Sequence, residues 1–329
     1  MGNTPLASVV IPTYNREAVL RRTLACLAGQ TLAADQFDVC VVDDGASDAI
    51  LALCQESFPF AVRYVRCQRQ GATLARNAGA QDSQGQVLVF LDDDIRPAPR
   101  TLEILVQGCR ETARTIMLGT LITPEANKTS VFARLNAPSP YAAQALTHDQ
   151  DVAATDCLTG LLAVRRADFL DLGLFQDPTG GWPNWDDVDF GYRAQQAGFR
   201  LRRSAQARAE HWDYSTADLT TMCRRWHRAG QSAVRLLRKY PALEPAMPMF
   251  ADKRPIAWGV DSPKLVARKL ARRAASSAVV ISALEWLTHG LEQHWAVEPV
   301  LRRLYRWIIG AYIFRGFQSG IKELQCSTL

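Results

Sequence analysis

The chain has 329 residues, 48% of them hydrophobic and 22% charged, and a formal net charge of +5. This length allows one large domain or two smaller ones with a sizeable buried core. The composition is that of an ordinary globular protein and excludes a disordered or low-complexity chain.

The charge is unevenly distributed along the chain. Residues 1–214 carry 20 Lys and Arg against 25 Asp and Glu, whereas residues 215–329 carry 18 against 8. A basic C-terminal part favours anionic partners such as phosphorylated substrates or acidic lipid, although a solvated face of basic helices explains the charge equally well. Nucleic acid is not among the partners that we expect.

Targeting and redox features predict a cytoplasmic protein. No basic region precedes an apolar stretch at the N-terminus, and the longest uncharged apolar stretch, residues 274–284, is too short to cross a bilayer. The eight cysteines are scattered, without a CxxC pair or a close Cys/His cluster. This pattern is typical of reduced thiols and not of a disulfide framework or a zinc site.

Strand and helix patterns alternate over residues 1–125. Apolar runs predict strands at residues 8–12, 37–42, 62–65, 86–91 and 116–121. Helical patterns occupy the segments between them, at residues 16–28, from residue 47, and at residues 71–83 and 100–113. Continuous apolar strands separated by helices indicate an α/β fold with a mostly parallel central sheet, covered on both faces.

The pattern changes after residue 125. Strands are expected at residues 158–164 and 200–203, with a helix from residue 166 and another at residues 185–197. Beyond residue 214 the pattern is almost purely helical. We therefore predict one domain over residues 1–214, with halves 1–125 and 126–214, followed by a basic helical region over residues 215–329.

Polar clusters follow three of the predicted strands: Thr13-Tyr14-Asn15, Asp43-Asp44 and Asp92-Asp93-Asp94. Ligands of open α/β sheets bind outside the carboxyl ends of the strands, so the clusters mark a candidate site. Neither a GxGxxG turn after the first strand nor a GxxxxGK[ST] loop occurs, which disfavours a dinucleotide fold of the nicotinamide type and a P-loop.

Asp92-Asp93-Asp94 is a candidate metal site. Three adjacent carboxylates repel one another unless a cation or hydrogen-bond donors neutralise them. Oxygen ligands suit Mg²⁺ and Mn²⁺, which in turn bridge a diphosphate. For these three residues taken alone, a solvated acidic turn remains the commoner explanation.

A second acidic group, Asp186-Asp187-Val188-Asp189, begins a predicted helix. On a helix Asp186 and Asp189 share one face, while Asp187 points elsewhere. Two explanations of these carboxylates remain open. They cap the helix N-terminus, or one of them is a general base that takes the proton of an attacking hydroxyl. His211 follows the next strand. A structural histidine is commoner, but this position also suits a third metal ligand.

Taken in order, these segments resemble the family 2 glycosyltransferases. The matching segments are VVIPTYNR, VVDDGASD, GATLARNAGA, VFLDDDIRP, Thr159-Gly160, NWDDVDFGYRAQQAGFRL and AEHW, over about residues 8–213. The resemblance implies a glycosyltransferase A-type fold, as in nucleotide-diphospho-sugar transferases. It also implies a nucleotide-diphosphate sugar as donor, most often a uridine-diphosphate sugar, with Mn²⁺ or Mg²⁺ and inversion of the anomeric centre.

The resemblance further implies roles for individual residues. The nucleotide sugar would be bound by Pro12, Thr13, Tyr14, Asp43, Asp44, Arg76, Asn77, Asp92 and Asp93. The metal would be bound by Asp94, Asp92 and His211, with Asp94 favoured as the direct ligand. Asp187 would be the general base, and beside it Asp186 replaces the usual glutamate of the family.

The same comparison favours a single addition in glycan or polysaccharide biosynthesis. Of the QxxRW motif of processive polymerases only Arg225-Trp226 remains. A sugar-phosphate nucleotidyltransferase is the first alternative, but its LxGGxGxR segment is absent. A non-catalytic scaffold that binds sugar nucleotides is the second, and such chains usually lose the carboxylates that this one keeps.

For the basic helical region, packing onto the catalytic domain is favoured slightly. The alternatives are a homodimer contact and peripheral contact with the inner face of a membrane, with Trp307, Tyr312 and Phe314 facing lipid. The acceptor is expected to be a hydroxyl of a glycan, a lipid-linked glycan or a small molecule.

Overall fold

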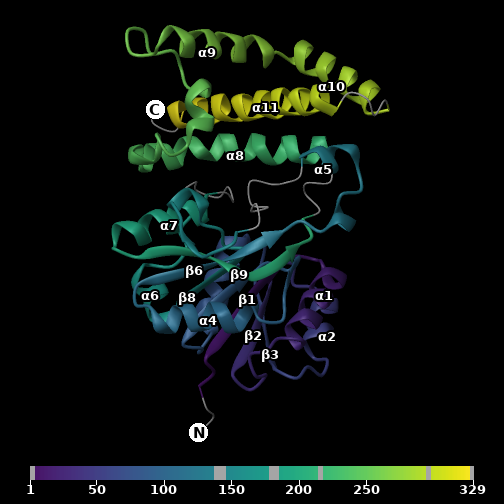
Figure 1. Cartoon of the computed structure of the whole chain (residues 1–329), viewed down its shortest axis with the longest axis vertical. Coiled ribbons are helices and arrows are strands. Elements are labelled where there is room, and N and C mark those ends of the chain that lie inside the picture. The colour runs from purple at the N-terminus through teal and green to yellow at the C-terminus, as the bar shows by residue number, and fades with distance from the viewer. Residues whose placement is uncertain (1–3, 137–145, 178–184, 214–217, 294–297, 327–329) are drawn as a thin grey trace. The chain divides into compact units, whose positions relative to one another are not determined.

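The computed structural model describes residues 4–136, 146–177, 185–213, 218–293 and 298–326. The chain forms two compact units, which we call the sheet unit and the helical unit (Figure 1). The sheet unit comprises Met1–Pro124, Ser139–Asp177 and Asp186–Trp212, and the helical unit comprises Glu125–Pro138, Pro178–Trp185 and Asp213–Leu329. The boundary that we predict after residue 214 falls among residues that are not described.

One mixed sheet forms the centre of the sheet unit. Within the described residues its strands lie in the order β3-β2-β1-β4-β8-β6-β9-β5, and β7 pairs with β9. They are β1 (Ala7–Thr13), β2 (Phe37–Asp43), β3 (Ala61–Arg66), β4 (Val87–Leu91), β5 (Ile95–Pro97), β6 (Thr115–Ile122), β7 (Gln150–Asp151), β8 (Leu161–Arg165) and β9 (Arg200–His211).

The predicted α/β sheet is confirmed, with antiparallel strands added to it. Strands β1 to β4 form parallel pairs, and β6 is parallel to β9. Strand β8 is antiparallel to β4 and β6, while β5 and β7 are antiparallel to β9. An apolar run such as that of β8 reveals that a strand is buried on both faces, but it carries no information on the direction of the strand.

Strand β9 is longer than predicted. We expect a strand at residues 200–203, but the structure continues it to His211 through Ala205, Ala207 and Ala209. Alanine is depleted in strands, so this part of the chain lacks a recognisable strand pattern. The extension positions the site, because β9 pairs with β5 and His211 lies opposite Ile95, next to the aspartate turn.

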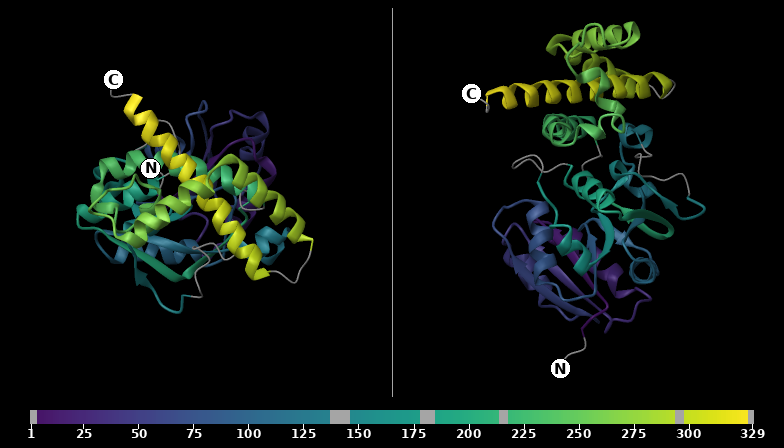
Figure 2. Two further views of the ribbon diagram at one scale, coloured as in Figure 1. Left: turned by 90° about the horizontal axis from the view of Figure 1, so that it is seen from above. Right: turned by 90° about the vertical axis from the view of Figure 1, so that its left-hand side faces the viewer.

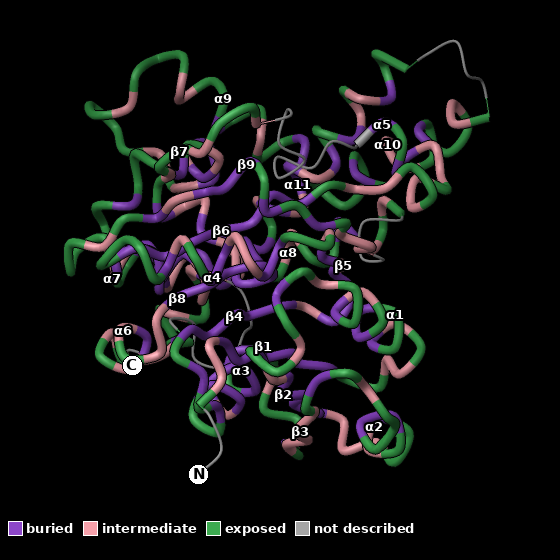
Figure 3. Tube along the Cα trace, turned by 60° about the horizontal axis from the view of Figure 1, so that its bottom comes forward, coloured by how far each residue is buried: buried purple, intermediate pink, exposed green. Residues whose placement is uncertain are grey.

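Helices cover both faces of the sheet. They are α1 (Glu17–Ala28), α2 (Asp48–Cys54), α3 (Ala72–Asp82), α4 (Thr101–Glu111), α6 (Arg166–Asp171) and α7 (Asp186–Gln196), with a 3-10 turn at Ala154–Asp156. In β1, Val9 and Ile11 enter the core formed with α1, α2 and α4, whereas Val10 enters the core formed with α3, α6 and α7. Successive strand residues point to opposite faces, so burial on both sides requires a continuous apolar run (Figure 3).

The helical unit contains α5 (Val131–Asn136), α8 (Leu219–Lys239), α9 (Pro263–Ala275), α10 (Ala278–Glu292) and α11 (Glu298–Cys326), with 3-10 turns at Glu125–Asn127, Pro241–Leu243 and Pro248–Lys253. Helix α11 lies between α8 on one side and the consecutive helices α9 and α10 on the other (Figures 1 and 2). In the part of the chain that the structure describes, no helix has both the length and the apolar character needed to cross a membrane.

Helices α8 and α11 approach each other backbone to backbone. A Cβ atom at Gly316 would lie 1.9 Å from the carbonyl oxygen of His227, and one at Gly230 would lie 2.6 Å from that of Ile313. A Cβ atom at Gly320 would likewise lie 2.3 Å from the carbonyl oxygen of Gln231. Because glycine has no side chain, it is the residue that permits this distance.

We predict that Gly316→Ala destabilises the protein by about 1–3 kcal/mol, since the added methyl group overlaps the backbone of α8. Urea unfolding followed by circular dichroism measures the change. Gly290→Ala is the matched control, because nothing lies within 4 Å of its Cβ position in α10. This control should gain up to about 1 kcal/mol from helix propensity. Equal unfolding midpoints for the two variants would contradict the close approach of α8 and α11.

Candidate active site

The polar clusters that follow β1, β2 and β4 lie at one edge of the sheet. Thr13 pairs with Asp43 in the register of β1 and β2, and Asp92 directly follows Leu91, the last residue of β4. Since β4 pairs with β1 in parallel, the three strands end on the same side. The sheet thus brings together segments that are up to 80 residues apart, such as Thr13 and Asp93.

Arg16 holds two of the three consecutive aspartates. Its Nη1 donates to Asp93 at 2.8 Å, and its Nη2 donates to Asp94 at 2.9 Å. Asp93 is buried and also accepts a hydrogen bond of 2.7 Å from the hydroxyl of Thr13. Burial raises the pKa of Asp93 to about 6, although Arg16 and Thr13 act in the opposite direction. The side chain of Asp93 therefore anchors the segment that follows β1.

Asp94 lies beside His211. The distance from His211 Nε2 to Asp94 Oδ1 is 3.5 Å, and the backbone N–H of Trp212 donates to the carbonyl oxygen of Asp94 at 3.0 Å. Burial raises the pKa of Asp94, but His211 and Arg16 lower it more, so that it lies below its ordinary value. An ionised carboxylate and a neighbouring imidazole can both be ligands of one divalent cation.

Arg76 connects Asp92 with Asp186. It is buried in α3, where its Nη2 donates to Asp92 and its Nη1 lies 3.6 Å from Asp186 Oδ2. One turn earlier, the hydroxyl of Thr73 donates to the same oxygen of Asp186 at 2.9 Å. The Nε atom of Arg76 is buried and has no hydrogen-bond partner among the described residues. These contacts join the N-terminal half of α3 to the start of α7.

Asp187 is the second residue of α7 and is half-buried. Its Oδ1 accepts a hydrogen bond of 2.8 Å from the backbone N–H of Val188. Burial and the nearby charge of Asp186 raise the pKa of Asp187 to about 7. A carboxyl group with a pKa near neutrality is well suited to accept a proton. Asp189 differs, because it is fully buried and pairs with Arg193 at 2.7 Å.

The carboxylates outnumber the guanidinium groups that hold them. Five aspartates, Asp92, Asp93, Asp94, Asp186 and Asp187, share Arg16 and Arg76 as partners or close charges. Among the described residues, no three His, Cys, Asp or Glu side chains form a complete metal site. The excess negative charge and the pair of Asp94 and His211 nevertheless fit a divalent cation whose other ligands come from a bound phosphate and water.

Asp43 and Asp44, which we predict to bind the nucleotide, accept hydrogen bonds from the backbone. The carboxylate of Asp43 accepts from the N–H of Gly45 at 2.9 Å and that of Ser47 at 2.6 Å. Asp44 accepts from Gln70 at 2.7 Å and from the N–H of Gly71 at 2.9 Å. Both carboxylates therefore shape the loops that follow β2 and β3.

Other predicted nucleotide-binding residues lie in different surroundings. The amide of Asn77 donates to the carbonyl oxygen of Phe175 at 2.8 Å and accepts from its N–H at 3.0 Å, so this side chain fixes the segment before α7. Pro12 is buried within β1, whereas Tyr14 is 44% exposed. Tyr14 thus offers an exposed ring at the carboxyl edge, which a nucleobase could stack upon.

Three residues contribute to the site without a role predicted from the sequence. Arg16 lies within the segment VVIPTYNR, and its charge, close to an acidic strand end, is the available signal. Thr73 gives no signal, since its hydroxyl meets Asp186 only when α3 packs beside α7. At Gly160, a Cβ atom would lie 3.0 Å from Asp92 Oδ2 and 2.9 Å from Ile95 Cδ1, so a glycine is needed beside the turn.

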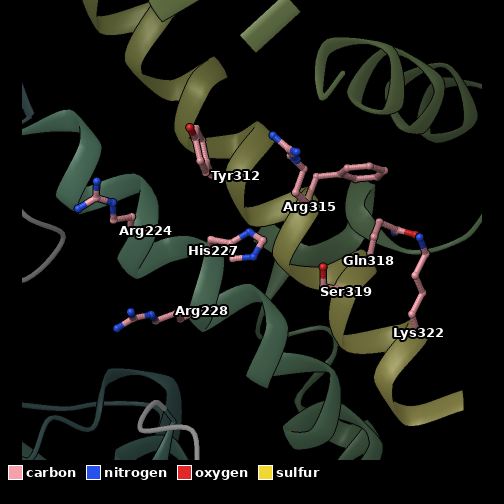
Figure 4. Close-up of a pocket in the computed structure, with 9 residues that line it drawn as sticks. Arg224, His227, Arg228, Tyr312, Arg315, Gln318, Ser319 and Lys322 are labelled. Atoms are coloured by element: carbon pink, nitrogen blue, oxygen red, sulfur yellow. The ribbon is translucent and has the colours of Figure 1, made fainter. Parts of the chain in front are cut away.

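The helical unit has a basic pocket of about 530 Å³ between α8 and α11 (Figure 4). Its lining residues are Arg224, His227, Arg228, Tyr312, Phe314, Arg315, Gln318, Ser319 and Lys322. None of them carries a carboxylate, so the pocket suits an anion and not a divalent cation. It contains none of the residues that the sequence predicts for the site.

The chain is similar in sequence and in structure to known glycosyltransferases. The chain is 27% identical over 311 residues to validoxylamine A glucosyltransferase of Streptomyces hygroscopicus subsp. limoneus, which covers 85% of this chain and 66% of that protein. The structure of this chain is similar to that of mannosyltransferase PcManGT from Pyrobaculum calidifontis in complex with GDP-Man and Mn²⁺. The TM-score is 0.61 and the sequence identity 19%, and the match covers 96% of this chain and 88% of that one.

A second structural likeness is to GalNAc-T7 with UDP, GalNAc and Mn²⁺, with a TM-score of 0.54 and 18% identity over 90% of this chain and 59% of that one. The two likenesses confirm the glycosyltransferase A-type fold that the sequence resemblance implies. The sequence model described as Glycosyl transferase family 2 matches residues 8–173, which is half of the chain. The chain therefore belongs to glycosyl transferase family 2.

Proposed function

We propose that this chain is an inverting glycosyltransferase that moves one sugar from a uridine-diphosphate sugar to a hydroxyl acceptor. The observation that carries the proposal is the crowding of five aspartates at the carboxyl edge of the sheet, one of them beside His211. Family membership supports a nucleotide-sugar donor. Two proteins of similar structure were solved with a nucleotide or nucleotide sugar and Mn²⁺, which supports manganese as the metal.

Asp94 and His211 are the residues that would hold the metal ion. A divalent ion bound there supplies stabilisation of the negative charge on the departing diphosphate. Asp92 would be a further ligand at the same turn, and each of the two carboxylates is also held by an arginine, Asp92 by Arg76 and Asp94 by Arg16. Arg76 in turn has a buried Nε–H without a partner among the described residues, which is a donor that a phosphate oxygen could use.

Asp187 is proposed as the general base. The acceptor oxygen forms a bond to the anomeric carbon while the bond from that carbon to the diphosphate oxygen breaks. The hydroxyl proton passes to Asp187, and the nucleoside diphosphate leaves. A single displacement of this kind inverts the anomeric centre. Asp186 supports the base, since it is held by Thr73 and Arg76 and its charge raises the pKa of Asp187.

The relatives guide the choice of donor to test. The name of validoxylamine A glucosyltransferase supports a glucosyl donor, and the chain spans 66% of the length of that relative. The basic pocket of the helical unit would fit a phosphate group. Arg224, Arg228, Arg315 and Lys322 line it and form no ion pair with the other described residues.

A non-catalytic scaffold that binds sugar nucleotides is the competing function. Such a protein does not need a carboxyl group with a pKa near neutrality beside the predicted donor site, and Asp187 is such a group. Turnover separates the two functions, because a scaffold binds the nucleotide without releasing sugar from it.

We predict that transfer or hydrolysis of UDP-glucose, UDP-GalNAc or GDP-mannose depends on Mn²⁺. Removal of the metal with EDTA should lower the rate roughly a thousand-fold, and added Mn²⁺ should restore it. Asp94→Asn should weaken Mn²⁺ binding, measured by electron paramagnetic resonance, by roughly tenfold or more. Asp93→Asn is the matched control, since Asp93 faces Thr13 and Arg16. An equal loss of Mn²⁺ affinity in both variants would contradict the assignment of Asp94.

We predict that Asp187→Asn is folded but inactive. The pKa of Asp187 in the folded protein lies above that of an unfolded aspartate. Ionisation of Asp187 therefore lowers the free energy of unfolding, and this loss develops as pH rises from about 4 to about 7. The variant should therefore have a higher Tm than the wild type at pH 8 and a similar Tm at pH 4. Differential scanning fluorimetry measures this shift. Near-normal turnover by the variant would contradict the assignment of Asp187 as the general base.

The same pKa predicts a pH dependence of the wild-type reaction. A base must be ionised to accept a proton, so kcat/KM should fall about tenfold per pH unit below the pKa of Asp187, which is about 7 in the protein without ligands. Initial rates in constant-ionic-strength buffers give the profile. A rate that stays constant down to pH 5 would show that no group of this pKa must be ionised.

A further inference from the structure

The exposed apolar side chains of this protein are concentrated in one part of the helical unit. Twelve large hydrophobic residues are exposed among the described residues, and nine of them lie between residues 258 and 307. They are Trp258, Val260, Leu270, Val279, Val280, Trp286, Leu287, Val300 and Trp307. Isolated exposed hydrophobic residues need no explanation, but a concentration of this kind marks an interaction surface.

Helix α10 directs its charges inward and its apolar side chains outward. Glu285 accepts a hydrogen bond of 2.9 Å from the hydroxyl of Tyr312, and Glu292 accepts one of 2.8 Å from Tyr305, both on α11. On the opposite side of α10, Val279 and Trp286 are each 80% exposed. Val279, Ala283, Trp286 and Gly290 share this outer side, since they follow one another at intervals of three or four residues.

Helix α9 directs two of its five basic side chains inward. Lys269 is buried and donates to Asp261 at 2.6 Å, and Arg272 lies 3.3 Å from Asp252. The exposed side carries a strip of small and apolar residues at helical spacing: Ala267, Leu270, Ala271 and Ala274. A helix that faces only water normally lacks such a strip, because its outward residues are polar.

The outer faces of α9 and α10 lie on one side of the helical unit. Both helices pack against α11 on the side away from α8 (Figures 1 and 2). Their faces away from α11 are exposed among the described residues of the unit. Together with Trp258 and Val260 in the preceding loop, they form what we call the outer face.

Basic residues border the outer face. Residues 258–307 contain eight Lys and Arg against four Asp and Glu. Lys264, Arg268 and Arg273 of α9 are exposed, and so are Arg303 and Arg306 of α11. Of the acidic residues, Asp261, Glu285 and Glu292 are engaged in the inward contacts described above. The free charge around the apolar strips is therefore positive.

We propose that the outer face of α9 and α10 binds the surface of an anionic lipid bilayer, with both helices lying in the plane of the interface. Apolar side chains with tryptophan on one face and flanking Lys and Arg are the features of interfacial helices. Tryptophan prefers the headgroup level, and the cations match acidic headgroups. At 13 and 15 residues, the two helices suit this orientation and not a membrane crossing.

The surface differs from the one that the sequence suggests. Of Trp307, Tyr312 and Phe314, only Trp307 is exposed, at 47%, whereas Tyr312 and Phe314 are half-buried and Tyr312 donates to Glu285. The helical period alone does not reveal that α11 is enclosed by α8 on one side and by α9 and α10 on the other. The lipid-binding residues are therefore assigned to α9 and α10.

The test is sedimentation of the full-length protein with vesicles of phosphatidylglycerol or of phosphatidylcholine, at low and at high salt. The wild type should bind phosphatidylglycerol vesicles at low salt and bind phosphatidylcholine weakly. The double variant Val279→Gln/Trp286→Gln should lower binding roughly fivefold or more, because it removes apolar contacts with the interface. Lys264→Glu/Arg273→Glu should lower binding to phosphatidylglycerol and remove its salt dependence.

Ile122→Gln is the matched control, since Ile122 is 40% exposed in the sheet unit. It should bind vesicles like the wild type, and circular dichroism should show that all variants are folded. Absence of wild-type binding at low salt would overturn the proposal, as would equal binding by Val279→Gln/Trp286→Gln. A lipid-free dimer that this double variant dissociates, measured by analytical ultracentrifugation, would assign the face to a second copy of the chain instead. None of these measurements requires transfer activity, so the lipid proposal and the proposed function can fail independently.

Discussion

At the carboxyl edge of the sheet, five aspartates lie close together and repel one another. Two arginine side chains offset this repulsion. Arg16 spans Asp93 and Asp94, while Arg76 spans Asp92 and Asp186. Arg16 directly precedes α1 and Arg76 lies in the N-terminal half of α3, so the contacts that balance the charge also connect these helices to the site. The outcome differs between two of the carboxylates. Asp94 stays ionised beside His211, and Asp187 has a pKa near neutrality.

Some polar residues at this edge of the sheet hold loops in place, and others carry the groups proposed for the reaction. Asp43, Asp44 and Asn77 use their side chains on backbone N–H and carbonyl groups, and so they shape loops and not the reacting groups. Such buried polar contacts hold a loop in one conformation because each broken bond would leave an unsatisfied group. Tyr14 is exposed at the same edge of the sheet.

In the helical unit, small residues at a helix–helix contact determine how closely two helices pack. Glycines at the α8–α11 contact allow the two backbones to touch, and the inward carboxylates of α10 then meet tyrosine hydroxyls on α11. With its polar groups used internally, α10 is left with an apolar outer side. The basic pocket and the outer face thus belong to one compact unit, and both favour anionic ligands, although their chemistry differs.

The sequence by itself determined the α/β fold, the position of the acidic clusters at strand ends and the family. Strand burial, helix period and turn residues are local properties, so they can be read from neighbouring residues. Tertiary structure alone decided the antiparallel direction of β8, the extension of β9 to His211 and the joining of Thr73 and Arg76 to Asp186. It also decided which sides of α9 and α10 face outward. These features depend on contacts between segments far apart in the chain, and hydrophobic periodicity carries no information on which distant partner a side chain will meet.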